Sequence, residues 1–223
     1  MKKQIPNLLT LLNLFCGIIA LRYALSQAFD WALFWFFLGI TLDFFDGFVA
    51  RILKVSSPLG KELDSLADLV TSGLVPGQVM YWLISYSAAH YGQTLHFFLP
   101  FAGYLITLAS AYRLACFNLD TRQSDSFIGL PTPANALFII SLGLIVKQAV
   151  YLKAIPLWGT LLITLASCVL LNSNLRLLAL KFKDFSIKNN LLKYLLLLIS
   201  VVLLVLMRES AFPLIILAYI LLS

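Results

Sequence analysis

Residues 43–51 have the sequence DFFDGFVAR, and residues 60–68, which follow after eight intervening residues, have the sequence GKELDSLAD. The four aspartates of these stretches are half of the eight in the chain, and the segments around them are apolar. An ionised aspartate at membrane depth costs about 3 kcal/mol or more, so four together require a compensating cation and a function. We therefore predict that these aspartates form the active site.

The composition is that of a membrane protein. Hydrophobic residues make up 61% of the 223 residues and charged residues 12%, against about 25% charged residues in an average soluble domain. The net charge of +6 comes from basic residues that flank apolar segments, which argues against a nucleic-acid partner. The cysteines Cys16, Cys116 and Cys168 form no C-x-x-C pair, and we expect all three to be buried core residues.

The apolar segments predict an all-α polytopic membrane protein with about eight transmembrane helices. A span needs about 20 mainly apolar residues to cross the hydrocarbon core, and clusters of Pro, Gly and polar residues separate such segments here. We expect one integral membrane catalytic domain over residues 1–223, with two extra C-terminal helices between 190 and 222. The predicted helices cover residues 6–25, 31–53, 60–86, 96–118, 132–150, 155–175, 190–207 and 211–222.

The distribution of basic residues predicts the orientation in the membrane. With the N-terminus inside, the cytoplasmic side carries twelve basic residues and the outer side four. This asymmetry places the aspartates at the cytoplasmic ends of the second and third helices. We expect a multi-pass protein of the cell (inner) membrane whose active site faces the cytoplasm. The twelve cytoplasmic residues are Lys2, Lys3, Arg51, Lys54, Lys61, Arg113, Arg122, Arg176, Lys181, Lys183, Lys188 and Lys193.

The spacing of the acidic residues places them on two helix faces. Residues three, four and seven apart share a face, and the short connection around Ser57 makes the two helices antiparallel. The carboxylates should therefore converge into a site for Mg²⁺ or Mn²⁺, because these ions prefer carboxylate oxygens and no His or Cys lies nearby. The first face carries Asp43, Asp46, Gly47 and Ala50, and the second carries Gly60, Asp64 and Asp68.

Small residues between the acids leave room for a bulky ligand against the helix backbones. Gly47, Ala50 and Gly60 occupy these positions. Magnesium held by protein carboxylates usually completes its shell with substrate phosphates, so we expect a diphosphate-linked substrate. Arg51 would add a cation at the phosphates and Ser57 a hydroxyl group.

Two other interpretations use parts of the same pattern. Acidic residues inside a membrane also form cation sites in ion-coupled transporters, which are built from inverted repeats and broken helices. Small residues at four-residue spacing are common where helices pack in a purely structural bundle. The acids of this chain lie near one membrane surface and no repeat is apparent, so the combined spacing favours an enzyme.

The complete array D-x-x-D-G-x-x-A-R, eight residues, G-x-x-x-D-x-x-x-D resembles the signature of the CDP-alcohol phosphotransferases. The resemblance implies a six-helix core over residues 1–175 and an enzyme with two divalent ions. Enzymes of this family move a phosphatidyl or phospho-alcohol group from a CDP-linked donor to an alcohol and release CMP.

Three further stretches resemble the phosphatidylserine synthase branch of that family. They are IPNLLT at residues 5–10, RLACFN at 113–118 and FIGLPTPA at 127–134. The branch implies CDP-diacylglycerol and L-serine as substrates, with membrane lipids around the protein and no nucleic acid. Cys116 is a departure, because the branch often has a second Arg at this position.

The resemblance also implies roles for individual residues. Asp43, Asp46, Asp64 and Asp68 would bind the metal ions, and Asp68 would also act as general base. The CDP-diacylglycerol site would contain Asn7, Thr10, Gly47, Ala50, Arg51, Ser57 and Gly60. The serine site is not carried over from the family in this way. From the residue itself we expect Arg113 to bind the serine carboxylate, because a guanidinium pairs well with a planar carboxylate, with Asn118 as a second candidate. The alternative for Arg113 is a membrane anchor at a helix end.

The nearest alternative is a phosphatidylglycerophosphate synthase, whose acceptor carries a phosphate. Such an acceptor should require several cations, whereas Arg113 is the one close to the cytoplasmic end of the fourth helix. Serine fits this modest charge better. The choice between Mg²⁺ and Mn²⁺, the lipid tails and the assembly, including a homodimer, stay open at this point.

Overall fold

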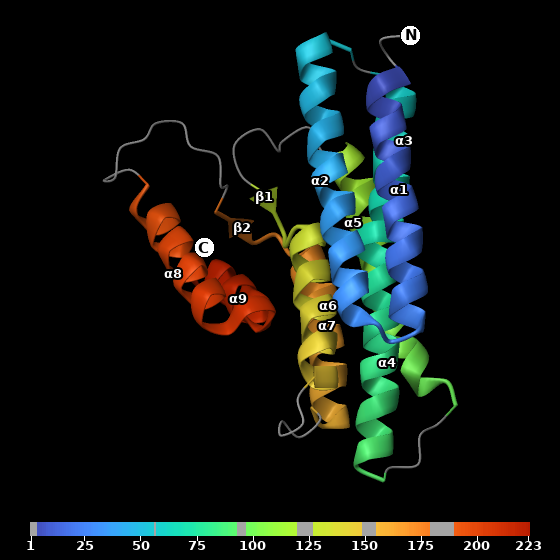
Figure 1. Cartoon of the computed structure of the whole chain (residues 1–223), viewed down its shortest axis with the longest axis vertical. Coiled ribbons are helices and arrows are strands. Elements are labelled where there is room, and N and C mark those ends of the chain that lie inside the picture. The colour runs from blue at the N-terminus through green and yellow to red at the C-terminus, as the bar shows by residue number, and fades with distance from the viewer. Residues whose placement is uncertain (1–3, 56, 93–96, 120–126, 149–154, 179–189) are drawn as a thin grey trace.

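The computed structural model of the chain describes residues 4–55, 57–92, 97–119, 127–148, 155–178 and 190–223. These residues form long helices that run side by side, with a tilted C-terminal pair beside them (Figure 1). The α-helices are α1 (Gln4–Leu25), α2 (Phe29–Leu53), α3 (Pro58–Asp68), α4 (Val75–His90), α5 (Leu105–Leu119), α6 (Thr132–Gln148), α7 (Leu157–Asn172), α8 (Leu191–Met207) and α9 (Phe212–Leu222).

Three helical segments in the described part of the chain are long and apolar enough to cross a membrane. They are α1, α2 and the segment Leu99–Leu119, in which the 3₁₀-helix η2 (Leu99–Tyr104) leads into α5. The helices α6, α7, α8 and α9 are apolar but shorter. The predicted class, an all-α polytopic membrane protein, is confirmed.

The third predicted helix has an irregular turn that the sequence pattern did not reveal. The chain runs from α3 through the π-helix η1 (Leu69–Leu74) into α4, and the helical structure extends from residue 58 to residue 90. A π-helical turn inside a longer helix is uncommon and occurs frequently at functional sites. Here it follows Asp68 directly.

A short β-bridge joins the loops after α5 and α7, which were predicted without strands. The strands β1 (Phe127–Ile128) and β2 (Arg176–Leu177) pair antiparallel, with Phe127 opposite Leu177. Gly129 follows β1 with a φ of +74°, and a Cβ there would lie 2.6 Å from the Leu171 carbonyl oxygen. Glycine is therefore required at this turn, since other residues rarely adopt such a φ and no side chain fits.

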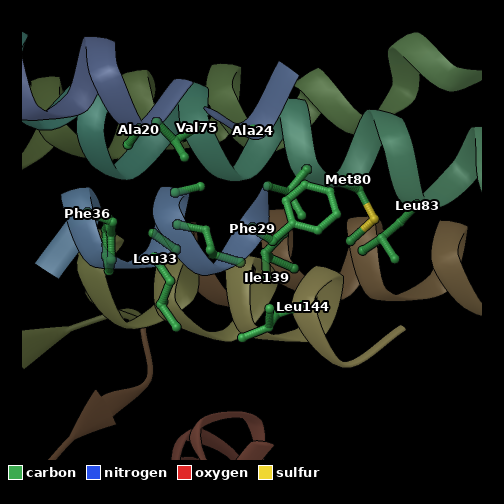
Figure 2. Close-up of a cluster of buried hydrophobic side chains, with 14 of the residues drawn as sticks. Ala20, Ala24, Phe29, Leu33, Phe36, Val75, Met80, Leu83, Ile139 and Leu144 are labelled. Carbon is green, nitrogen blue, oxygen red and sulfur yellow. The ribbon is translucent and has the colours of Figure 1, made fainter. Parts of the chain in front are cut away.

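The main core lies between α1, α2, α4 and α6. Small residues of α1, Ala20 and Ala24, allow close approach, and Phe29, Met80 and Ile139 fill the space between the helices (Figure 2). Each of these five residues is fully buried. Because the core holds α1 and α2 against the α3–α4 segment, it also fixes the helix ends that carry the aspartates.

The C-terminal helices α8 and α9 stand to one side of the main bundle (Figure 1). Helix α9 packs against α6, and a small cluster of Leu130, Leu177, Leu196 and Tyr219 joins the pair to the β-bridge. The 3₁₀-helix η3 (Arg208–Ala211) connects α8 to α9. These contacts bring Tyr219 toward the helices of the site.

The expectation that all three cysteines are buried is wrong for Cys116 and only partly met by Cys168, which is half-buried against the main core. Cys116 is exposed rather than buried, because residues 115–117 all lie on outward-facing positions near the end of α5. An apolar neighbourhood in sequence does not imply burial within the protein when the surroundings are lipid.

Some of the basic residues used to predict the orientation in the membrane lie outside the described residues. They are Lys2, Lys3, Arg122, Lys153, Lys181, Lys183 and Lys188.

Candidate active site

Local sequence signals end α2 and begin α3, and they set the reversal that brings the two acidic faces together. Lys54 ends α2 in a left-handed conformation, with its backbone N–H directed at the carbonyl groups of the last turn. Ser57 caps α3, since its Oγ accepts a hydrogen bond of 3.0 Å from the Gly60 N–H, and Pro58 occupies the first turn. Ser57 was predicted as a substrate contact, and it also has this structural role.

Helix α1 completes the site from a third direction. It packs against both α2 and α3, while α2 also contacts η1. A cavity of about 350 Å³ lies among the ends of these helices. Its lining residues are Pro6, Asn7, Thr10, Asp46, Gly47, Ala50, Val55, Ser57, Gly60, Lys61 and Asp64. All of these except Pro6, Val55 and Lys61 were predicted as site residues.

Three of the four aspartates converge beside this cavity. One carboxylate oxygen from each of Asp43, Asp64 and Asp68 lies within 4.8 Å of the others. Negative charges at such distances repel one another strongly, especially away from bulk water. The donor set consists of carboxylate oxygens, which suits a hard divalent cation such as Mg²⁺ or Mn²⁺.

Asp46 lies in the cavity wall and has a different environment. It is buried, and its Oδ2 accepts a hydrogen bond of 2.5 Å from the Thr10 hydroxyl group. Thr10 Oγ1 is also 3.0 Å from the Pro6 carbonyl oxygen. Helix α1 thus orients one carboxylate of α2 through Thr10, next to the trio formed by the other three aspartates.

Asp68 lies where α1, α3 and α5 meet. Asn13 Nδ2 donates a hydrogen bond of 3.4 Å to Asp68 Oδ1. Arg113 on α5 lies close enough to Asp68 for their charges to interact, and Tyr219 of α9 is nearby. Arg113 is buried, and among the residues that the structure describes its Nε has no hydrogen-bond partner. A buried guanidinium N–H without a partner is uncommon and points to a ligand or water at this position.

Two predicted ligand contacts have side chains that are engaged elsewhere. Arg51 is exposed, does not line the cavity, and donates from its Nε to the Gly47 carbonyl oxygen at 3.0 Å. Asn118 donates from Nδ2 to Ser65 Oγ at 2.8 Å, which joins the end of α5 to α3. These hydrogen bonds occupy Arg51 Nε and Asn118 Nδ2, so a substrate contact would come from the other polar atoms of these side chains or from an exchange of partners.

Sequence analysis did not identify Lys61 and Asn13 as site residues. Lys61 lines the cavity, and its Nζ donates to the Asn118 carbonyl oxygen at 2.5 Å. Its position directly after Gly60 was the available signal, but its charge was assigned to membrane orientation alone. Asn13 carried no signal beyond being a polar residue in an apolar helix.

The fold and the site define an integral membrane protein with a carboxylate cluster suited to divalent cations, beside a cavity at the ends of three helices. The family described as CDP-alcohol phosphatidyltransferase matches residues 3–170. The chain belongs to this family of enzymes, and the recognition made from the signature is confirmed.

Relatives with curated names belong to the predicted branch. The chain is 37% identical over 142 residues to the CDP-diacylglycerol–serine O-phosphatidyltransferase of Bacillus subtilis (strain 168), covering 62% of this chain and 74% of the relative. It is 36% identical over 137 residues to the protein of that name from Helicobacter pylori (strain J99 / ATCC 700824), covering 60% and 55%. For the Saccharomyces cerevisiae protein, identity is 32% over 169 residues, covering 69% and 58%. The aligned region thus spans just over half of the last two relatives.

Proposed function

We propose that the protein transfers a phosphatidyl group from CDP-diacylglycerol to the hydroxyl group of L-serine and releases CMP. The observation that carries this proposal is that Asp64 belongs both to the carboxylate trio and to the wall of the cavity. A metal-held diphosphate and a nucleotide can therefore be neighbours. Family membership and the names of the relatives support the same reaction.

Asp43, Asp64 and Asp68 would hold the divalent ions, with Asp46 beside them. The family resemblance implies two ions, either Mg²⁺ or Mn²⁺. When bound, such ions would neutralise the negative charge of the diphosphate and of the leaving CMP. The protein supplies the carboxylate oxygens from α2 and α3, and Thr10 fixes the orientation of Asp46.

The cavity is proposed to bind the cytidine diphosphate part of the donor. A Cβ at Gly60 would lie 3.1 Å from both Asn7 Oδ1 and Ser57 Oγ, so the glycine keeps these polar atoms close to the helix backbone. Gly47 leaves open space on the opposite wall. Lys61 would offer its ammonium group to the diphosphate. The exposed Arg51 would contact the diphosphate by exchanging its hydrogen bond to the Gly47 carbonyl oxygen for one to a phosphate oxygen.

Asp68 is proposed to act as the general base. Its carboxylate would accept the proton of the serine hydroxyl while the hydroxyl oxygen forms a bond to the phosphorus that carries the diacylglycerol. The bond between this phosphorus and the oxygen of CMP breaks, and CMP leaves with the electron pair. A base is needed because a neutral alcohol is a weak nucleophile, and positioned proton transfer contributes about 10²- to 10⁴-fold to a rate.

Arg113 is proposed to bind the carboxylate of serine. Its guanidinium is buried and close enough to Asp68 for their charges to interact, and its Nε has no partner in the described part of the chain. An acceptor with a phosphate group would require more positive charge than Arg113 alone supplies, so serine fits better than glycerol 3-phosphate. Membership of a phosphatidyltransferase family argues against an ion-coupled transporter.

We further propose that residues 1–223 form one catalytic domain, with a core over residues 1–175 and the helices of residues 190–222 added to it. The proposed location is the cell membrane, with the site facing the cytoplasm. This orientation is supported by the distribution of basic residues along the sequence. A homodimer remains a prediction that chemical crosslinking in membranes would test.

A panel of acceptors tests the proposed function. The purified protein in detergent is given CDP-diacylglycerol, Mg²⁺ or Mn²⁺, and one of L-serine, glycerol 3-phosphate or inositol, and the release of CMP is measured. We expect release that depends on serine and on the metal, with phosphatidylserine as the lipid product. Release with glycerol 3-phosphate alone would overturn the serine assignment but keep the reaction class.

Replacing Arg113 by Lys is expected to raise the KM for serine about tenfold or more, as loss of a charge-assisted hydrogen bond implies. Lysine keeps the charge but not the planar fork of donors. The KM for CDP-diacylglycerol should stay within about twofold of wild type, because Arg113 does not line the cavity. Arg22→Lys, at an exposed site in the last turn of α1, is the matched control. An unchanged KM for serine would contradict the assignment.

Replacing Gly47 by Leu is expected to raise the KM for CDP-diacylglycerol without unfolding the protein. A Cβ at Gly47 would have no atom within 4 Å and Gly47 lines the cavity, so we expect the larger side chain to occupy cavity space that the donor would otherwise fill. Steady-state kinetics and thermal unfolding in detergent measure the two effects. Gly47→Ala adds one methyl group and should show the smaller change in KM. If Gly47→Leu binds the donor normally, the nucleotide does not occupy this cavity.

A further inference from the structure

A buried chain of hydrogen bonds, made by residues that do not line the cavity, leads to Asp68. Asn13 Nδ2 donates to Asp68 Oδ1 at 3.4 Å, and Thr71 Oγ1 donates to Asn13 Oδ1 at 3.0 Å. Asn13 and Thr71 are both 0% exposed. These hydrogen bonds link Thr71 of η1 to Asn13 of α1, and Asn13 to Asp68 at the end of α3. They therefore join α1 to a segment distant in sequence that carries the proposed base.

The Thr71 hydroxyl supports the orientation of the Asn13 amide that Asp68 requires. An ionised carboxylate can only accept, so the NH₂ group of Asn13 faces Asp68 and its Oδ1 faces Thr71. Thr71 Oγ1 lies 3.0 Å from Asn13 Oδ1 and 3.3 Å from the Asn13 carbonyl oxygen, and the amide oxygen is the nearer of these two acceptors. The reversed amide would direct an oxygen atom at the carboxylate and remove its hydrogen bond.

Glycines of two helices enclose the Asn13–Thr71 pair. A Cβ at Gly17 of α1 would overlap Thr71 Oγ1, and a Cβ at Gly39 of α2 would lie 2.9 Å from Asn13 Oδ1 and 3.0 Å from Thr71 Cγ2. Real Cβ atoms do not approach other atoms this closely, so only glycine fits at either position without displacing the pair. The close fit restricts rotation of both polar side chains.

We infer that Asn13 and Thr71 are positioning residues for the Asp68 carboxylate. The amide occupies one lone pair of Oδ1 and limits rotation of the carboxylate, which leaves Oδ2 to accept the proton of the acceptor hydroxyl. This inference rests on the proposed function, in which Asp68 is the base. Neither residue lines the cavity, so their effect should fall on the proton-transfer step and not on donor binding.

Thr71→Val tests the inference because valine keeps the shape of threonine and removes only the hydroxyl group. We expect kcat to fall about tenfold or more, which corresponds to about 1.4 kcal/mol of lost transition-state stabilisation. The KM values for both substrates should stay within about twofold of wild type. Thr71→Ser restores the hydroxyl and should return kcat to within about twofold of wild type.

The control and a second variant separate positioning from general stability. Thr164 of α7 is 1% exposed, and its Oγ1 donates at 2.8 Å to the Thr160 carbonyl of its own helix. Thr164→Val should leave kcat unchanged. Asn13→Leu should lower kcat at least as much as Thr71→Val, and the double variant should be little worse than Asn13→Leu, because the two residues act through one interaction.

The inference is overturned if Thr71→Val has the kcat of wild type, if Thr71→Ser is as impaired as Thr71→Val, or if the loss appears in the KM for CDP-diacylglycerol. Wild type and Asp68→Asn are assayed alongside to keep the two proposals distinct. If another alcohol of the panel replaces serine, the serine assignment fails and the positioning test is run with that alcohol. If Asp68→Asn keeps its turnover, Asp68 is not the base, and both the mechanism and the positioning role fail.

Discussion

Replacing Asp68 by Asn is expected to lower the rate of CMP release about a thousandfold while CDP-diacylglycerol still binds. The amide cannot accept the proton of the acceptor hydroxyl, and loss of a positioned base typically costs about 10²- to 10⁴-fold in rate. Binding should persist because Asp68 does not line the cavity, whereas Asp46 and Asp64 do. The kcat for CMP release and the equilibrium binding of CDP-diacylglycerol, both at saturating metal, measure the two parts.

Asp30 provides the matched control for this substitution. It lies in the first turn of α2, at the other end of the helix from Asp43 and Asp46, and it is exposed. Asp30→Asn should leave both kcat and donor binding at wild-type values. Turnover by Asp68→Asn within about tenfold of wild type would show that another group removes the proton, since tenfold is below the usual contribution of a base.

Replacing Asp64 by Asn is expected to impair metal binding and donor binding together, and to lower turnover at low metal about a hundredfold or more. Asp64 contributes an oxygen to the carboxylate trio and also lines the cavity. Loss of its charge should raise the concentration of Mg²⁺ or Mn²⁺ needed for half-maximal activity, because a neutral amide oxygen is a weaker ligand for these ions. A titration of activity against metal concentration measures the shift.

Metal removal gives an independent measurement of the same site. Chelation with excess EDTA should abolish CMP release by the wild-type protein, and added Mg²⁺ or Mn²⁺ should restore it. Asp64→Asn should then need more metal for recovery than wild type, and Glu62→Gln should behave as wild type, since Glu62 is exposed and outside the cavity lining. Activity that survives chelation, or an unchanged metal midpoint in Asp64→Asn, would show that the trio does not hold the ion.

The helices and most residues around the cavity could be predicted because their signals are local. Apolar length defines a membrane helix, and spacing of three or four residues places Asp43 and Asp46, or Asp64 and Asp68, on one face. Ser57 followed by Pro58 is a local signal for the start of α3. The convergence of two acidic faces also followed from the short connection between α2 and α3, and the trio of Asp43, Asp64 and Asp68 is the observed result.

The contacts that involve α1 and α5 could not be predicted in the same way. Asn13 and Thr71 are 58 residues apart, and each is an ordinary polar residue in an apolar segment. Their hydrogen bonds depend on how closely α1 approaches η1. The role of Arg113 was equally hard to predict from the sequence. A basic residue near the predicted end of a helix can anchor the helix at the membrane surface as well as bind a ligand.

Hydropathy and helical periodicity were enough to predict a helical membrane protein with a four-aspartate signature at one end of two helices, because both depend only on neighbouring residues. The structure was needed to show that Asp46 pairs with Thr10 in the cavity wall, that the other three aspartates form the trio, and that Asn13 donates a hydrogen bond to Asp68. The reason is physical, because these arrangements depend on close packing of α1 against both α2 and α3, and the distances between helices are set by side chains far apart in the chain.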